Sequence, residues 1–176
     1  MQKQERILGY WLCLAEPARR IFAELIRDLA GQFDAPVFEP HVTIYVTSAK
    51  QENPGAVLEQ VLKGREPLRL NVAGLDYSAK FTKTLFVQFA PDPELARLSE
   101  HLRRASASGN DFELNPHLSL IYKEMNEETK RRLSGSITLP FSEVTFDTVK
   151  VIISPTEIKA REDIEAWRVV AQQNLV

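Results

Sequence analysis

The stretch Pro40-His41-Val42-Thr43-Ile44-Tyr45-Val46 is nearly repeated later in the chain by Pro116-His117-Leu118-Ser119-Leu120-Ile121-Tyr122. Each stretch has a proline, a histidine, an aliphatic residue and a hydroxyl residue, followed by further apolar residues. In an extended strand alternate side chains share a face, so His41 lies beside Thr43 and His117 beside Ser119. Two such histidine–hydroxyl pairs facing each other could hold a phosphate group and act on it from both sides.

The repeat extends beyond the two motifs. The histidines are 117 − 41 = 76 residues apart, and the same offset aligns Pro17 with Pro93. Each of these prolines follows an apolar run, residues 7–14 and 84–90, and precedes apolar residues at helical spacing. Asp92 is a good N-cap candidate with Pro93 at the first helical position. The sequence therefore predicts two units, each with a strand, a proline-started helix, a loop and a Pro-His strand.

Further elements complete an α+β pattern. Strands are expected at Leu68–Leu75, within Ser142–Ile153 with an interruption near Asp147, and at Glu165–Ala171, and short helices at Pro54–Leu62 and Glu127–Leu133. Because strands outnumber helices and follow one another in places, we expect two mostly antiparallel sheets lining a central cleft, with the helices outside. Residues 1–176 would form a single domain of two lobes, approximately 1–83 and 84–176, related by a pseudo-two-fold. Whether the lobes exchange strands is left open.

Composition places the chain among globular proteins. Its 44% hydrophobic content gives enough material for one core, and no apolar stretch has the length needed to span a membrane. The segment Met1–Arg6 does not resemble a signal peptide, so the cytoplasm is the default location. Cys13 is the only cysteine, which excludes a disulfide framework and a cysteine-based metal site. We expect a monomer.

The charge balance favours a small ligand. The chain has 22 basic and 24 acidic residues and a net charge of −2. Proteins that bind long nucleic acids usually carry a basic excess, because each phosphate contact displaces counterions. A small phosphorylated molecule therefore fits this chain better than a polymer.

The paired motifs resemble those of the two-histidine (2H) phosphoesterase superfamily, whose members have a LigT-like fold. They are most similar to the small cyclic phosphodiesterases that act on 2′,3′-cyclic nucleotides and ADP-ribose 1″,2″-cyclic phosphate. The bacterial RNA 2′,3′-cyclic phosphodiesterases, once called 2′–5′ RNA ligases, are more distant. The resemblance covers nearly the whole chain. It implies that His41 and His117 are catalytic, that Thr43 and Ser119 bind phosphate, and that Tyr122 contacts the substrate.

The implied reaction is the opening of a small cyclic phosphodiester to a phosphomonoester, without a metal or another cofactor. A neutral imidazole can deprotonate the attacking water while an imidazolium protonates the departing oxygen. Attack and departure are roughly in line, so the two groups must stand on opposite sides of phosphorus. On resemblance, His117 is the base and His41 the acid.

Other residues are weaker candidates. Tyr122 has odd parity relative to His117, so a regular strand would point it away from the histidine face, and only a bulge or the end of the strand would turn it back. The loop between two strands offers Lys80, Phe81 and Lys83 as contacts to a base and its phosphates, and Trp167 is either core or pocket wall. The aromatic residues Trp11, Phe86 and Phe89 are expected in the core.

Two alternatives stay open. The substrate could be an RNA end carrying a 2′,3′-cyclic phosphate, although the acidic balance opposes this. The chain could also be a non-catalytic module that binds nucleotides or RNA. A lone strand histidine is usually structural, but two at matched positions favour catalysis. The third histidine, His101, lies on a predicted helix and is expected to be a surface residue.

Overall fold

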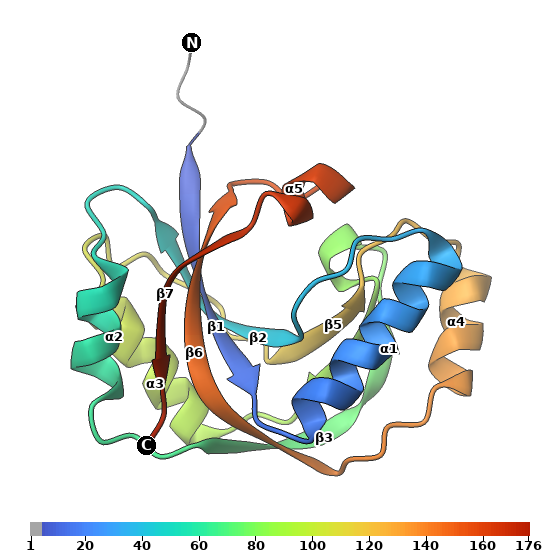
Figure 1. Ribbon diagram of the computed structural model, residues 1–176, viewed down its shortest axis with the longest axis horizontal. Helices are drawn as coiled ribbons and strands as arrows, with labels where there is room; N and C mark the ends of the chain where they lie inside the picture. The colour runs from blue at the N-terminus through green and yellow to red at the C-terminus, as the bar shows by residue number, and fades with distance from the viewer. Residues whose placement is uncertain (1–4) are drawn as a thin grey trace.

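The computed structural model describes residues 5–176. In this range the chain forms seven strands, β1 (Arg6–Leu14), β2 (His41–Ser48), β3 (Leu68–Tyr77), β4 (Leu85–Phe89), β5 (His117–Ile121), β6 (Glu143–Pro155) and β7 (Arg168–Asn174). Five α-helices accompany them within the same residues: α1 (Ala18–Phe33), α2 (Pro54–Leu62), α3 (Pro93–Ala105), α4 (Glu127–Ser136) and α5 (Arg161–Glu165). A 3-10 helix, η1 (Phe81–Lys83), precedes β4. Figure 1 shows α2 and α3 together at one end and α1 and α4 at the other, with the strands between.

All strand pairings are antiparallel, which confirms the expected α+β class. The strands form one hydrogen-bonded sheet in the order β1-β2-β5-β4-β3-β6-β7, where two sheets were expected. Strand β6 makes the difference, because its first residues pair with β3 and its remainder pairs with β1. The pairings therefore run in a closed circuit through six strands, and β7 lies along the outer edge of β6.

The order of elements repeats along the chain, as strand–helix–strand–helix–strand in β1-α1-β2-α2-β3 and again in β4-α3-β5-α4-β6. The halves are interleaved: β3 pairs with β4 of the second half, and β6 pairs with β1 of the first. Helix α1 packs near β5, and α3 packs near β2. Because strands from both halves share one sheet, the division into two lobes near residues 83 and 84 stays a prediction.

Local signals explain where most elements begin. The Asp92 carboxylate accepts the Leu95 N–H and caps α3, with Pro93 in the first turn, as predicted. Asn53 caps α2 in the same way. The expected strand in Ser142–Ile153 is a single one, and the interruption near Asp147 is a bulge, because Cys13 pairs with Thr148 and Leu14 with Phe146.

The prediction of a last strand at Glu165–Ala171 was wrong at its start. Glu165 ends the short helix α5, and the strand begins only at Arg168. The helix forms because the Asp163 carboxylate accepts the N–H groups of Lys159 and Ala160 at its first turn. Because Asp163 lies within the first turn and is polar, the pattern of apolar residues did not indicate that a helix begins here.

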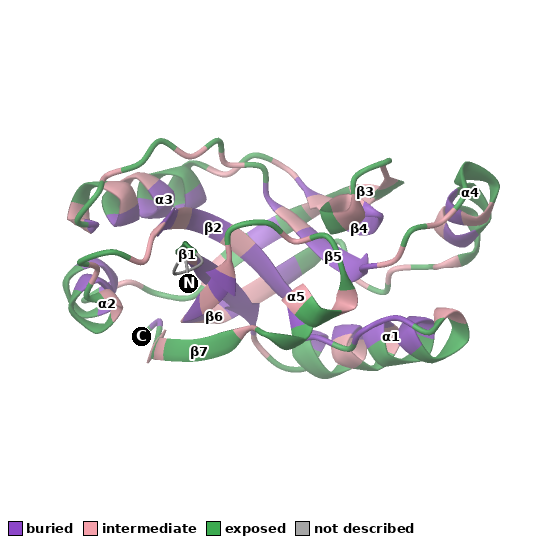
Figure 2. Cartoon of the chain, turned by 90° about the horizontal axis from the view of Figure 1, so that it is seen from above, coloured by how far each residue is buried: buried purple, intermediate pink, exposed green. Residues whose placement is uncertain are grey.

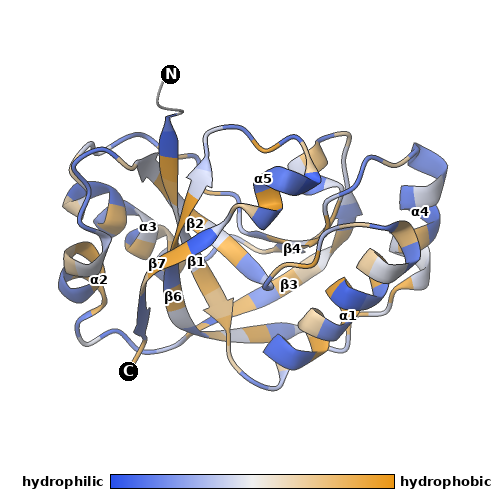
Figure 3. Cartoon of the chain, turned by 45° about the horizontal axis from the view of Figure 1, so that its top comes forward, coloured by the Kyte–Doolittle hydropathy of each residue, from blue (hydrophilic) through white to orange (hydrophobic). Residues whose placement is uncertain are grey.

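The core lies between the sheet and the four longer helices. Figure 2 shows buried residues along the central strands and exposed residues on the outer sides of the helices and on β7. Hydrophobic and hydrophilic residues alternate along α1 and α2 in Figure 3, as expected of helices that cover a sheet with one face. No helix within residues 5–176 has the length and apolar character to cross a membrane. The expectation about Met1–Arg6 falls mostly on residues 1–4, outside the described part.

Candidate active site

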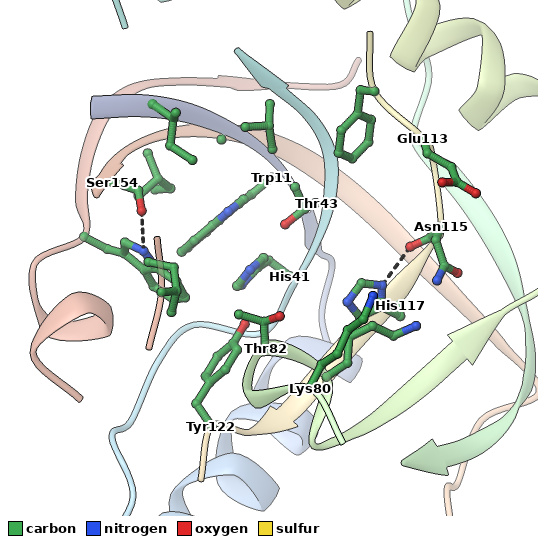
Figure 4. A pocket seen from close by; sticks show the side chains of 18 residues that line it. Trp11, His41, Thr43, Lys80, Thr82, Glu113, Asn115, His117, Tyr122 and Ser154 are labelled. Carbon is green, nitrogen blue, oxygen red and sulfur yellow. Dashed lines mark hydrogen bonds between the residues drawn. The ribbon is translucent and has the colours of Figure 1, made fainter. Parts of the chain in front are cut away.

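The two Pro-His motifs line one cavity of about 530 Å³. Strands β2 and β5, which carry them, are adjacent in the sheet and pair through Val42 and Leu118, the residues that directly follow the two histidines. Continuing this antiparallel register by one residue in each direction places each histidine across from the hydroxyl residue of the other motif. Figure 4 shows His41, Thr43 and His117 around the same space. The two histidines and Thr43 thus converge on one cavity.

Both imidazoles are held by the same local contact. The Nδ1–H of His41 donates to the Glu39 carbonyl oxygen at 2.7 Å, and the Nδ1–H of His117 donates to the Asn115 carbonyl oxygen at 2.7 Å. A carbonyl oxygen can only accept, so Nδ1 carries the proton in each ring. The other nitrogen, Nε2, then has its lone pair free when the ring is neutral. Each neutral ring can therefore accept a proton at Nε2, and each protonated ring can donate one from the same atom.

The residues that hold the rings are themselves anchored. Glu39 and Asn115 are 76 residues apart, so they occupy equivalent positions in the repeat. The Nζ of Lys150, on β6, donates to both carboxylate oxygens of Glu39 at 2.7 and 2.8 Å. The Nε2 of Gln88, on β4, donates to the Asn115 side-chain oxygen at 2.9 Å. A neighbouring strand thus fixes the segment that orients each histidine, and no local sequence pattern indicates either anchor.

The surroundings of the two histidines differ. Burial, with a smaller contribution from His117, lowers the pKa of His41 to about 3, although the hydrogen bond to Glu39 opposes this shift. Burial also lowers the pKa of His117, the Asn115 contact opposes this, and the charge of Lys83 adds to the lowering. Both rings are therefore neutral near pH 7 in the free protein. A bound phosphate anion would raise both pKa values by charge attraction.

The ring of His41 is stacked on Trp11. Their centroids lie 3.5 Å apart with an interplanar angle of 8°, and Trp167 meets both rings edge-on. Trp11 was expected in the core, and it is 7% exposed, but it also lines the cavity. Register explains this: Trp11 pairs with Thr43, and the bulge at Ile44 keeps both on the cavity face. The apolar run around Trp11 concealed its position.

The two motif hydroxyls are not equivalent. Thr43 lines the cavity, whereas Ser119 is buried and does not. The Ser119 hydroxyl donates to the carbonyl oxygen of Thr82 at 2.9 Å, because η1 lies over this part of β5. Thr82 itself lines the cavity, a position that sequence reasoning missed.

Tyr122 lies in the cavity wall despite its odd parity. Strand β5 ends at Ile121, so Tyr122 is free of the strand's alternation. Its ring packs on Phe38 with centroids 4.4 Å apart and edge-on to Trp167 at 5.7 Å. Burial raises the pKa of the Tyr122 phenol to about 12, so it stays protonated and can donate a hydrogen bond.

Three of the four weaker candidates for substrate contact line the cavity. Lys80, Lys83 and Trp167 line the cavity, but Phe81 does not and packs toward Tyr122. Trp167 donates its Nε1–H to the Ser154 hydroxyl at 3.0 Å (Figure 4). The cavity also includes Val46 of the first motif. Its lining is completed by residues outside both motifs: Ile7, Gly9, Trp11, Thr82, Phe112, Glu113, Asn115, Ile152, Ser154 and Ile158. Residues 5–176 contain no group of three or more His, Cys, Asp or Glu arranged to hold a metal ion.

Comparison with known proteins adds two kinds of likeness. Residues 15–156 match the model of the 2′-5′ RNA ligase superfamily. Over 173 residues, 96% of the chain and 95% of the relative, the sequence is 25% identical to a cyclic phosphodiesterase of Arabidopsis thaliana. In fold, the chain is similar to TT0787 of Thermus thermophilus, with a TM-score of 0.63, 18% identity and coverage of 96% and 97% of the two chains. It is also similar to E. coli LigT complexed with 3′-AMP, with a TM-score of 0.59, 15% identity and coverage of 97% and 98%.

Proposed function

Because the chain belongs to the 2′-5′ RNA ligase superfamily, the group of 2H phosphoesterases, we propose that it hydrolyses small cyclic phosphodiesters to phosphomonoesters. The substrates are nucleoside 2′,3′-cyclic phosphates or ADP-ribose 1″,2″-cyclic phosphate, and the reaction needs no metal. The observation that carries this proposal is the matched pair of histidines, each with Nδ1–H bound to a carbonyl oxygen two residues earlier, in one cavity. The cyclic phosphodiesterase of Arabidopsis, which is similar over nearly the whole chain, supports it.

In the proposed reaction the two imidazoles act on opposite sides of phosphorus. His117 Nε2 takes a proton from water as the new P–O bond forms, and His41 Nε2 gives a proton to the ring oxygen as the old P–O bond breaks. Burial opposes a charge on His41. Its stack on Trp11 and the negative phosphate both stabilise the imidazolium once the substrate is bound. Thr43 and Tyr122, which line the cavity, would donate hydrogen bonds to the charged oxygens.

A second candidate substrate is an RNA end with a 2′,3′-cyclic phosphate. Lys80 and Lys83 line the cavity beside His117 and would suit an additional phosphate of an oligonucleotide. The net charge of −2 favours the small substrate. Hydrolysis of a cyclic-phosphate-ended oligomer but of no mononucleotide would reverse this ranking.

The test uses the purified protein with EDTA and measures opening of the four nucleoside 2′,3′-cyclic phosphates and ADP-ribose 1″,2″-cyclic phosphate. His41→Ala or His117→Ala should lower turnover by about 10²–10⁴-fold, because each removes one proton-transfer group. His101→Ala is the matched control, since the third histidine is exposed on α3, and it should keep full activity. Full activity in either motif variant refutes the mechanism. Nucleotide binding without hydrolysis would identify a binding module.

A further inference from the structure

Strand β1 contributes a glycine, Gly9, to the lining of the cavity. Gly9 pairs with Val46 of β2 on one side and with Ile152 of β6 on the other. A glycine inside a strand costs about 0.5–1 kcal/mol relative to alanine, and it often marks a close approach of a ligand or another backbone. A glycine here therefore suggests that either the backbone conformation, the protein packing or a bound ligand requires the absence of a side chain.

The fold itself does not require Gly9. Its backbone is not among those with positive φ. A Cβ built on it would meet only Trp11, at 3.4 Å from Nε1 and 3.7 Å from Cδ1, which is ordinary contact. Neither backbone conformation nor protein packing thus excludes a side chain. What the glycine does provide is open space on the cavity side of the sheet.

The space beside Gly9 is lined by apolar side chains. We call it the Gly9 recess, and its walls are Ile7, Val46, Ile152 and the edge of the Trp11 indole, all of which line the cavity. His41 covers one face of the Trp11 ring, so Trp11 presents its Nε1 edge to the recess. Apolar walls disfavour a charged group, which would lose its hydration there. They favour a flat, uncharged ring.

One hydrogen-bond donor points at this recess. In residues 5–176 the Trp11 Nε1–H has no partner in the protein, whereas the Trp167 Nε1–H donates to Ser154. Since no buried side-chain N or O atom of the described residues lacks a partner, the Trp11 Nε1–H must be accessible from the cavity. A ring in the recess with an acceptor on its rim would satisfy this donor.

Given the proposed function, on which this step rests, we propose that the Gly9 recess binds the base of a nucleoside 2′,3′-cyclic phosphate, with Trp11 Nε1–H donating to an acceptor on the base. Trp11 pairs with Thr43, beside His41, so phosphorus lies at the level of Trp11 along the sheet. Gly9 is two residues further, about 7 Å by the rise of a strand. The ribose spans this interval.

The test compares two substrates in three proteins. Wild type, Gly9→Ala and Gly9→Val are assayed with a nucleoside 2′,3′-cyclic phosphate and with ribose 2,3-cyclic phosphate, which has the same reacting ring but no base. Gly9→Val should lower kcat/KM at least tenfold for the nucleotide and less than twofold for the base-free compound. Gly9→Ala should show the same selectivity to a smaller extent. Gly31→Ala is the matched control, since Gly31 is exposed on α1 with nothing within 4 Å of a built Cβ, and it should change neither value.

The outcomes separate the two proposals. If wild type opens both compounds and Gly9→Val affects both equally or neither, the recess does not bind the base, while the proposed function stands. If wild type opens ADP-ribose 1″,2″-cyclic phosphate but neither of these compounds, the recess assignment fails and the proposed function stands, whereas no opening of any of the three refutes both. Indole N–H NMR signals give a readout besides activity, because the chain has two tryptophans. A nucleoside 2′-monophosphate should shift the Trp11 signal clearly more than ribose 2-phosphate does, because only the former brings an acceptor to Nε1, and equal shifts would overturn the proposal.

Discussion

The ion pair between Lys150 and Glu39 should control turnover without touching the substrate. Lys150 is on β6, its Nζ holds both carboxylate oxygens of Glu39, and the Glu39 carbonyl oxygen holds the His41 ring. Lys150→Met removes the ammonium and keeps most of the side-chain volume. The Glu39 carboxylate then loses its partner, and the segment that orients His41 is free to move. Lys150 is thus a positioning residue.

The magnitude follows from the burial of the pair. Its side chains are 18% and 29% exposed, between a surface pair worth about 0–1 kcal/mol and a buried pair whose disruption costs about 3–5 kcal/mol. We expect Lys150→Met to lower the free energy of unfolding by about 2 kcal/mol. A displacement of about 1 Å at a reacting group can cost about 100-fold, so kcat should fall about 10- to 100-fold. KM should change little, because no substrate contact is removed.

Steady-state kinetics and denaturant unfolding check this prediction at a temperature where every variant is folded. Lys150→Arg should restore most of kcat, since a guanidinium can also hold the Glu39 carboxylate. Lys50→Met is the matched control, because Lys50 pairs with Glu5 on the surface at 76% and 73% exposure. It should leave both stability and kcat unchanged within the precision of the measurement, because solvent screens an exposed pair. A Lys150→Met protein that loses stability but keeps kcat would show that the pair is only structural.

Two further predictions concern the site's own residues. Because burial lowers the pKa of His41 to about 3, the unfolded chain binds a proton below its ordinary pKa near 6.5 and the folded chain does not. Stability should therefore fall as pH drops below 6.5, by about 2 kcal/mol at pH 5 from this residue, and His41→Asn should flatten that dependence in pH-resolved unfolding curves. A second prediction separates the hydroxyls: Thr43→Val should lower kcat about 100-fold at unchanged stability, if Thr43 donates to a developing charge. Ser119→Ala should cost roughly 1 kcal/mol of stability, because it removes the buried donor to Thr82, and should affect kcat less. Equal rate effects of the two variants would contradict this distinction.

The parts of the site that follow from local rules were predictable from sequence. Strand alternation placed His41 beside Thr43, and the 76-residue offset identified His117 as its counterpart. The pair Asp92 and Pro93 predicted the start of α3, with the aspartate as its N-cap. These features depend on neighbours within a few residues, so a single sequence contains the information.

The parts that depend on long-range register were not predictable. Strand β6 pairs with both β1 and β3, so the two expected sheets are joined into one. The same arrangement brings Lys150 into contact with Glu39, 111 residues away in the sequence. Trp11 could be assigned to the cavity only after its pairing with Thr43 was known. Ser119 matches the motif, yet a 3-10 turn from another segment covers it. In each case the decisive contact joins residues far apart in the sequence, and no local pattern predicts such a contact.

The single Val42–Leu118 pairing has a consequence for the direction of bond cleavage. It lies at the midpoint between two motifs of similar sequence with matching histidine contacts, so the motifs alone would suit a phosphodiester in either of two opposite orientations. The surroundings differ, with an aromatic stack on the imidazole of His41, a lysine charge beside that of His117, and a cavity-lining hydroxyl at Thr43 but not at Ser119. If the proposed reaction holds, these differences and not the repeat itself would choose the orientation of the phosphodiester and so the oxygen that leaves phosphorus.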